Sequence, residues 1–164
     1  MASEASGLRV SLRPLRAWEI DSLAASIPET SAAQLANRWR EQTMGYRELL
    51  AAVIGGEVVG TVSIGESERP PRSLHLFALE VASARRNQGI GAEIVRGVIE
   101  EARRRNLRRV YLEVRVDNPA RRLYHRLGFR RVGPPFINAW WRYHADGTQE
   151  RVEELSYRMV KRVR

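Results

Sequence analysis

Apolar and polar residues follow one another along this chain in two rhythms, one typical of strands and the other of helices. Leu8, Val10 and Leu12 alternate with polar residues and predict a first strand that ends near Pro14. Residues 74–82 are almost continuously apolar, which is typical of a strand covered on both faces. Shorter apolar or alternating runs predict further strands at residues 47–54, 58–64, 110–116, 129–132, 136–144 and 152–160.

Helical spacing is clearest after residue 90. Within residues 90–105 the apolar side chains share one helix face: Ile94, Val95, Val98, Ile99 and Ala102. We predict two earlier helices at residues 17–25 and 31–42, and a short one that begins at Asn118-Pro119 and is ended by Gly128.

The order of these elements predicts an α/β fold. Gly55-Gly56-Glu57 and Ala145-Asp146-Gly147 indicate two hairpin turns. The helical crossovers around strands 74–82 and 110–116 should make these two strands parallel neighbours. Because no repeat, linker or break in composition interrupts residues 8–164, we predict a single domain there, preceded by a loose tail at residues 1–7.

Composition narrows the possible partners. The net charge of +9 is compatible with nucleic acid, an acidic lipid surface or an anionic cofactor. Lys161 is the only lysine, so the charge reflects a general preference for arginine, and we do not expect nucleic acid as a partner. The absence of cysteine excludes disulfides and thiolate zinc sites, and the three histidines are too scattered for a metal site. No leader-like or membrane-spanning apolar run occurs, so we expect a cytoplasmic protein.

The spacing Arg-x-x-Gly-x-Gly at residues 86–91 lies between strand 74–82 and the following helix. A glycine-rich turn entering a helix presents free backbone N–H groups and the positive end of the helix dipole, which together bind an anion, most often a phosphate. A dinucleotide fingerprint is excluded because its third glycine position holds Ile94, and a P-loop is excluded because no Gly-Lys-Ser/Thr follows.

Two segments resemble the GNAT superfamily of acyl-CoA-dependent N-acetyltransferases. The first is Arg86-Asn87-Gln88-Gly89-Ile90-Gly91 after a strand that ends Leu79-Glu80-Val81, and the second is residues 118–129, Asn-Pro-Ala-Arg-Arg-Leu-Tyr-His-Arg-Leu-Gly-Phe. The resemblance covers residues 8–162. It implies the GNAT fold: a mixed central sheet of about seven strands with helices on both faces, in which the two parallel central strands splay apart.

The resemblance also implies a site for acetyl-CoA. The pyrophosphate would lie on the N–H groups of residues 87–92, the pantetheine arm along the strand end, and the thioester between the splayed strands. The implied cofactor-binding residues are Leu79, Glu80, Val81, Arg86, Asn87, Gln88, Gly89, Ile90, Gly91, Ala92, Asn118 and Tyr124. Asn118 and Tyr124 are six residues apart where the family has seven, a change of about a third of a helical turn, so Asn118 is the less certain of the two.

For catalysis the resemblance implies Tyr124 as the proton donor to the leaving thiolate, although Tyr124 shares an apolar helix face and could be a core residue. Glu113 and Glu80, each in an apolar strand, are the candidate bases. The segment Leu112-Glu113-Val114-Arg115 resembles bacterial ribosomal-protein N-terminal-alanine acetyltransferases, in which this glutamate is the base. Either carboxylate could instead pair with Arg115 or another arginine.

The acceptor is expected to be an amine, either a peptide N-terminus or a small molecule. Trp140, Trp141 and Tyr143 lie near the usual acceptor site, but core or hairpin packing explains them better. The arginine-rich segment 121–131 could contact the 3′-phosphate of the coenzyme. Two other functions stay open at this point, a non-catalytic acyl-CoA sensor and a basic nucleic-acid-binding domain. The protein could be a monomer or a homodimer, and no metal is expected.

Overall fold

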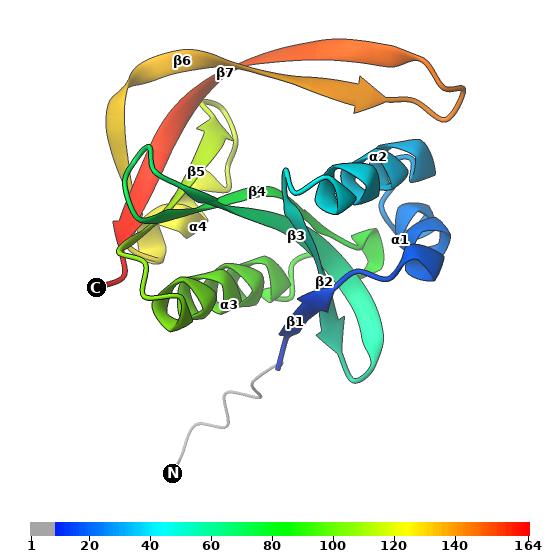
Figure 1. The fold of residues 1–164 in the computed structure, drawn as a ribbon, viewed down its shortest axis with the longest axis horizontal. Coiled ribbons are helices and arrows are strands. Elements are labelled where there is room, and N and C mark those ends of the chain that lie inside the picture. Colours follow the sequence, from blue (N-terminus) through cyan, green and yellow to red (C-terminus); the bar gives the residue numbers. More distant parts are fainter. Residues whose placement is uncertain (1–8) are drawn as a thin grey trace.

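A computed structural model describes residues 9–164, so the predicted tail and Leu8 lie outside the described residues. Seven strands form one sheet in the order β1-β2-β3-β4-β5-β7-β6 (Figure 1). The strands are β1 (Ser11–Pro14), β2 (Glu48–Ile54), β3 (Glu57–Ser67), β4 (Ser73–Val81), β5 (Arg109–Arg115), β6 (Arg130–Tyr143) and β7 (Gln149–Arg162). The helices are α1 (Ile20–Ser26), α2 (Ala32–Thr43), α3 (Ile90–Arg104) and α4 (Arg121–Arg126), with short 3-10 turns η1 (Ala17–Glu19) and η2 (Ser83–Arg85).

Strands β4 and β5 are parallel, whereas the other neighbouring pairs are antiparallel. The predicted mixed sheet and its central parallel pair are therefore confirmed. Pairing between β4 and β5 is short, because it begins at Ser73 with Arg109 and ends at His75 with Tyr111. Both strands continue beyond this point, so they separate toward their carboxyl ends.

A bulge in β4 accompanies this separation. Across from Thr61 and Ser63 on β3, the paired residues on β4 are Glu80 and Phe77, so one extra residue is inserted into β4. Within this insertion Ala78 has a φ of 50°, which is rare for a residue with a Cβ atom. A bulge bends its strand and increases the local twist. It lies where β4 has already left β5.

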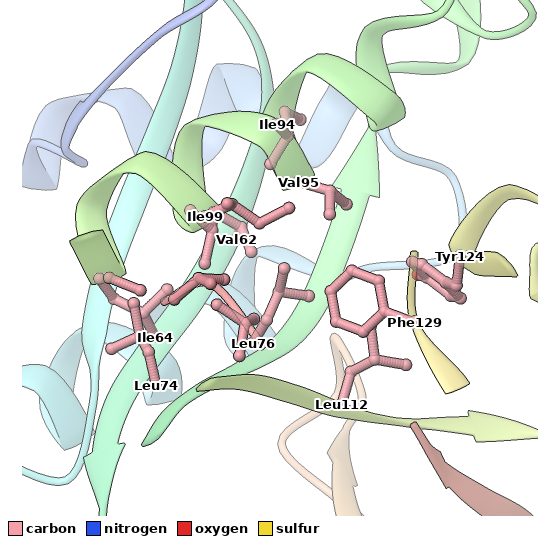
Figure 2. Packing of buried hydrophobic residues seen from close by; sticks show 14 of the residues in the cluster. Val62, Ile64, Leu74, Leu76, Ile94, Val95, Ile99, Leu112, Tyr124 and Phe129 are labelled. Atoms are coloured by element: carbon pink, nitrogen blue, oxygen red, sulfur yellow. The ribbon is translucent and has the colours of Figure 1, made fainter. Parts of the chain in front are cut away.

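Helix α3 covers one face of the sheet because its apolar residues form a stripe. Ile94, Val95 and Ile99 point toward Val62 on β3 and Leu76 on β4 (Figure 2). Phe129, which follows α4, is fully buried in the same core between Leu112 and Tyr124 (Figure 2). This packing fixes β4, β5 and α4 relative to one another.

Helices α1 and α2 cover the opposite face, so the prediction of helices on both faces is also confirmed. Leu23, Ile27 and Leu35 form a second core with Leu49 and neighbouring residues of β2. The long β6–β7 hairpin extends past the sheet and reaches α2 (Figure 1). There Gln34 accepts a hydrogen bond from the backbone N–H of Tyr143 at 2.6 Å.

Four predicted elements differ in detail from the structure. Residues 129–132 and 136–144 belong to one strand, β6, whose pairing with β7 is interrupted between Val132 and Phe136. Gly133, with a φ of 74°, precedes two prolines that cannot donate to the sheet, which explains the interruption. The predicted helix 17–25 begins as the 3-10 turn η1, and α4 begins only at Arg121.

The close contact of β3 with β4 predicts a stability effect at Gly60. A Cβ atom placed on Gly60 would lie 2.6 Å from the backbone oxygen of Glu80, so Gly60→Ala must push the two strands apart. We expect it to lower the free energy of unfolding by about 1–3 kcal/mol, measured by urea denaturation. Gly65→Ala is the matched control, because a Cβ atom at this position of the same strand meets nothing within 4 Å. Equal stability of the two variants would contradict the prediction.

Candidate active site

Two adjoining hollows open where β4 and β5 separate. The larger hollow, of about 1710 Å³, extends from this gap to the start of α3, and the smaller, of about 640 Å³, lies between β4, β5, α2 and the β6–β7 hairpin. Leu79, Asn118, Tyr124 and Glu154 are among the residues that line both. The two hollows therefore form one continuous cleft across the separated strands.

The loop before α3 forms one end of the larger hollow. Asn87 and Gly89 have φ values of 62° and 78°, and Gly89 caps the helix that begins at Ile90. The first N–H groups of α3 have no partner within the helix and carry the positive end of its dipole, as an anion site requires. The predicted cofactor-binding residues line this hollow with the exception of Gln88, which is exposed.

The exposed edge of β4 continues from this loop toward the middle of the cleft. Among residues 9–164, β3 pairs with one edge of β4 as far as Val81, but β5 pairs with the other edge only as far as His75. The β5-facing edge at Leu79 and Glu80 is thus without a strand partner in the described chain. An unpaired strand edge can bind an extended ligand through main-chain hydrogen bonds.

Arg86 stands at the entrance of the larger hollow, but its side chain is already engaged. Its guanidinium binds the carboxylate of Glu29 through both terminal nitrogens at 2.7 Å, and its Nε donates to the backbone oxygen of Val81 at 3.2 Å. The hydrogen bonds from Arg86 lower the pKa of Glu29 to about 2. The pair joins the segment between α1 and α2 to the loop, so the predicted contribution of Arg86 to an anion site would require this pair to rearrange.

Tyr124 and Asn118 both lie in the cleft despite their shortened spacing. Tyr124 is 9% exposed, packs edge-on against Phe129, and has its pKa raised by burial, so its phenol stays protonated at neutral pH. The side-chain oxygen of Asn118 accepts a hydrogen bond from the N–H of Ala120 at 2.9 Å, which shapes the turn into α4. The turn absorbs the missing residue without removing either side chain from the cleft.

The two candidate bases have different neighbours. One carboxylate oxygen of Glu80 lies 2.7 Å from Nη2 of the buried Arg38, and the other accepts a hydrogen bond from the hydroxyl of Thr30. Glu113 lies 2.5 Å from Nε2 of His75 and 3.6 Å from Nη2 of Arg158.

Arg115, predicted as a possible partner of either base, forms its ion pair with Asp117 instead, at 2.6 Å. Glu80 is therefore held by a full ion pair, whereas Glu113 faces the smaller hollow beside an imidazole.

Several residues of the cleft were not predicted from the sequence. His75, Arg38 and Glu154 all line the smaller hollow. The sequence feature that could have indicated a role for His75 is its place as a polar residue in a mostly apolar strand, two residues before Phe77. Trp140, Trp141 and Tyr143, for which core or hairpin packing was the favoured explanation, line the smaller hollow as well, and Trp141 is 52% exposed.

Two features are absent from residues 9–164, a metal-binding cluster and a membrane-spanning helix. Over that range, no set of three or more His, Cys, Asp or Glu side chains is grouped closely enough to hold a metal ion. In the same part of the chain, none of the helices has both the length and the apolar character needed to cross a membrane.

Comparison with known proteins identifies the family. Residues 12–129, which contain the loop before α3, β4, β5 and α4, match the model of the Acetyltransferase (GNAT) family. The chain belongs to the GNAT family. This agrees with the resemblance carried by the two sequence segments and with the separated parallel strands of the structure.

Individual N-acetyltransferases are similar to somewhat more than half of the chain. N-acetyltransferase 8F1 of Mus musculus is 37% identical over 92 residues, which are 54% of this chain and 41% of that protein. The N-alpha-acetyltransferase RimI of Mycobacterium tuberculosis is 36% identical over 96 residues, 57% of this chain and 59% of that protein. The chain thus matches about two fifths to three fifths of these relatives.

A solved structure confirms the GNAT fold over a greater length. The spermidine N-acetyltransferase of Vibrio cholerae in complex with CoA and spermine aligns with a TM-score of 0.69 and 18% identity, covering 93% of this chain and 95% of that one.

The Arg38–Glu80 pair yields a prediction about the role of Glu80. Arg38→Met leaves the Glu80 carboxylate without its cation, and breaking a buried pair in this way should cost about 3 kcal/mol of unfolding free energy. The double variant Arg38→Met/Glu80→Gln has no unpaired carboxylate at this position, so part of the lost unfolding free energy should be recovered. We expect a coupling energy of about 1–3 kcal/mol from a double-mutant cycle by urea denaturation. Additive effects would show that the pair does not hold Glu80 in place.

Proposed function

We propose that this GNAT protein transfers the acetyl group of acetyl-CoA directly to an amine. The observation that carries the proposal is the continuous cleft at the separated strands. It leads from a helix N-terminus suited to phosphate, along an unpaired strand edge, to a buried tyrosine and a carboxylate. These are the parts that an extended, phosphate-bearing thioester and its acceptor require.

Acetyl-CoA is the proposed co-substrate, in keeping with the family and with the CoA held by the similar Vibrio cholerae protein. Its pyrophosphate would bind the N–H groups of residues 87–92, where two positive φ angles turn the backbone toward the ligand. Its pantetheine amides would pair with the free edge of Leu79–Val81 like an added strand. Asn118 and Tyr124 would then lie beside the thioester end of the arm.

The chemistry needs a base for the acceptor ammonium and an acid for the leaving thiolate. We assign the base to Glu113 and the acid to Tyr124, whose raised pKa keeps its proton available at neutral pH. The neutral amine attacks the thioester carbon, the C–S bond breaks, and the sulfur takes the phenolic proton. The attacking nitrogen then loses its second proton, which restores the phenol of Tyr124. Glu80 is the weaker candidate for the base because Arg38 lies only 2.7 Å from one of its oxygens and Thr30 donates to the other, whereas the arginine beside Glu113 is 3.6 Å away.

The acceptor would enter through the smaller hollow. Its walls carry the aromatic side chains of Trp140, Trp141 and Tyr143 and the carboxylate of Glu154. Aromatic rings and a carboxylate suit the side chains and ammonium group of a peptide N-terminus or of a small amine. The similarity to RimI of Mycobacterium tuberculosis supports the peptide alternative.

The direct test is release of CoA thiol from acetyl-CoA in the presence of an amine panel. The panel contains peptides with different N-terminal residues, small primary amines and polyamines, and mass spectrometry of the acceptor confirms an added acetyl group. We expect thiol release that depends on the acceptor. Tight binding of acetyl-CoA without transfer to any member would instead indicate a sensor of the same fold.

Tyr124→Phe tests the acid. Loss of the hydroxyl should lower kcat at least about tenfold, because the thiolate would leave without its proton, while the KM for acetyl-CoA and the melting temperature stay close to wild type. Tyr46→Phe is the control, since Tyr46 is 70% exposed and lines neither hollow. Unchanged turnover in Tyr124→Phe would remove the acid role.

A further inference from the structure

His75 lies where β4 leaves β5. It is the last residue of β4 that pairs with β5, opposite Tyr111, and its side chain lines the smaller hollow. From there its Nε2 lies 2.5 Å from Oε2 of Glu113, which is two residues beyond Tyr111 on the same face of β5. The end of strand pairing thus brings together two titratable groups that are 38 residues apart in the sequence.

Two aromatic rings hold the imidazole in place. It stacks on Phe77 with a centroid distance of 4.6 Å and on Tyr111 with 4.5 Å, and the planes of His75 and Tyr111 differ by only 5°. A ring stacked on two neighbours has little freedom to rotate. Its Nε2 therefore stays directed at Glu113 even though a quarter of the side chain is accessible from the hollow.

A distance of 2.5 Å between Nε2 and Oε2 requires one proton between these atoms, because two lone pairs would otherwise face each other. In the resting state a neutral imidazole donates this proton to an ionised carboxylate. A second proton can be added to the pair, and the imidazole can hold the resulting positive charge while the carboxylate stays ionised beside it. Histidine–carboxylate pairs in other enzymes stabilise an imidazolium in this way.

Charged groups lie at both ends of the stack formed by Phe77, His75 and Tyr111. They affect the addition of a second proton to the His75–Glu113 pair. The guanidinium of Arg47 lies over Phe77 at 4.7 Å, and that of Arg158 lies over Tyr111 at 5.4 Å. The carboxylate of Glu41, 2.6 Å from the guanidinium of Arg47, offsets the charge of Arg47. The guanidinium of Arg158 is also 3.6 Å from the carboxylate of Glu113. The two cations disfavour an imidazolium, whereas Glu113 in direct contact favours it.

We propose that His75 and Glu113 act together as one base. This proposal rests on the proposed acetyl transfer. Glu113 takes a proton from the acceptor ammonium, and the charge is shared with His75 through the Nε2–Oε2 hydrogen bond. The amine nitrogen keeps its electron pair for the thioester carbon. Of the two protons that the ammonium loses in one turnover, one ends on the CoA sulfur and the other leaves to solvent by way of the pair.

Two substitutions of His75 separate proton sharing from positioning. In His75→Gln the amide can still donate to Glu113 but cannot accept a proton, and His75→Phe retains a stacked ring without any polar atom. We expect both to lower kcat at least about tenfold with the KM for acetyl-CoA unchanged. Because neither variant can share the proton with an imidazole, the dependence of kcat on pH should also change in both.

His125→Gln is the control. His125 is exposed on α4 and lines neither hollow of the cleft, so its loss should leave the dependence of kcat on pH unchanged. Wild-type kcat with a wild-type pH profile in His75→Gln would show that His75 only orients Glu113, and the proposal would fall.

A measurement independent of activity tests the pair itself. The chain has three histidines, so NMR can observe each imidazole, with His125 and His144 as internal references. In the wild type the Nε2 proton of His75 should give a strongly downfield resonance, because it lies in a short hydrogen bond to a carboxylate, and Glu113→Gln should move this resonance upfield. An unmoved resonance would overturn the proposal even if the enzyme is active. A moved resonance in a protein that acetylates no amine would sustain the pair and remove only the proposed function.

Discussion

The early end of pairing between β4 and β5 is the constraint on which the cleft depends. Parallel strands normally continue their hydrogen bonds, but here the pairing stops at His75 and both strands run on. The bulge at Ala78 accompanies the divergence, at the cost of a positive φ in a residue with a Cβ atom. The core beneath, with Phe129 fully buried beside Leu112, fills the space that the separation would otherwise leave empty (Figure 2).

The separation also gives the two carboxylates of the central strands different surroundings. Glu80, on the strand that turns away, is held by Arg38 from α2, and this ion pair connects the sheet to the helix that covers it. Glu113, on the strand that continues, meets His75 across the gap. One carboxylate thus joins β4 to α2, whereas the other lies in contact with an imidazole. Their placement on two strands that no longer pair is what makes this division possible.

The sheet, its parallel pair and the loop before α3 could be predicted because each leaves a local pattern. Periodicity places strands, and Gly89 occupies a left-handed position that favours glycine. The bulge could not be predicted, since alanine has no preference for the positive φ of Ala78. The partners of the charged side chains could not be predicted either, because they depend on how the strands are paired. Arg158 lies opposite Glu113 through the register of β7 with β5, whereas Arg115, which is close to Glu113 in the sequence, binds Asp117.

A crystal structure of the protein with CoA is the most direct test of whether CoA binds where β4 and β5 separate. If the unpaired edge of β4 is the binding surface, the pantetheine amides will hydrogen-bond the main chain of residues 79–81, with the pyrophosphate on residues 87–92 and the sulfur within reach of the Tyr124 hydroxyl. A CoA molecule bound outside the gap between β4 and β5, or with its sulfur directed away from Tyr124, would contradict the account.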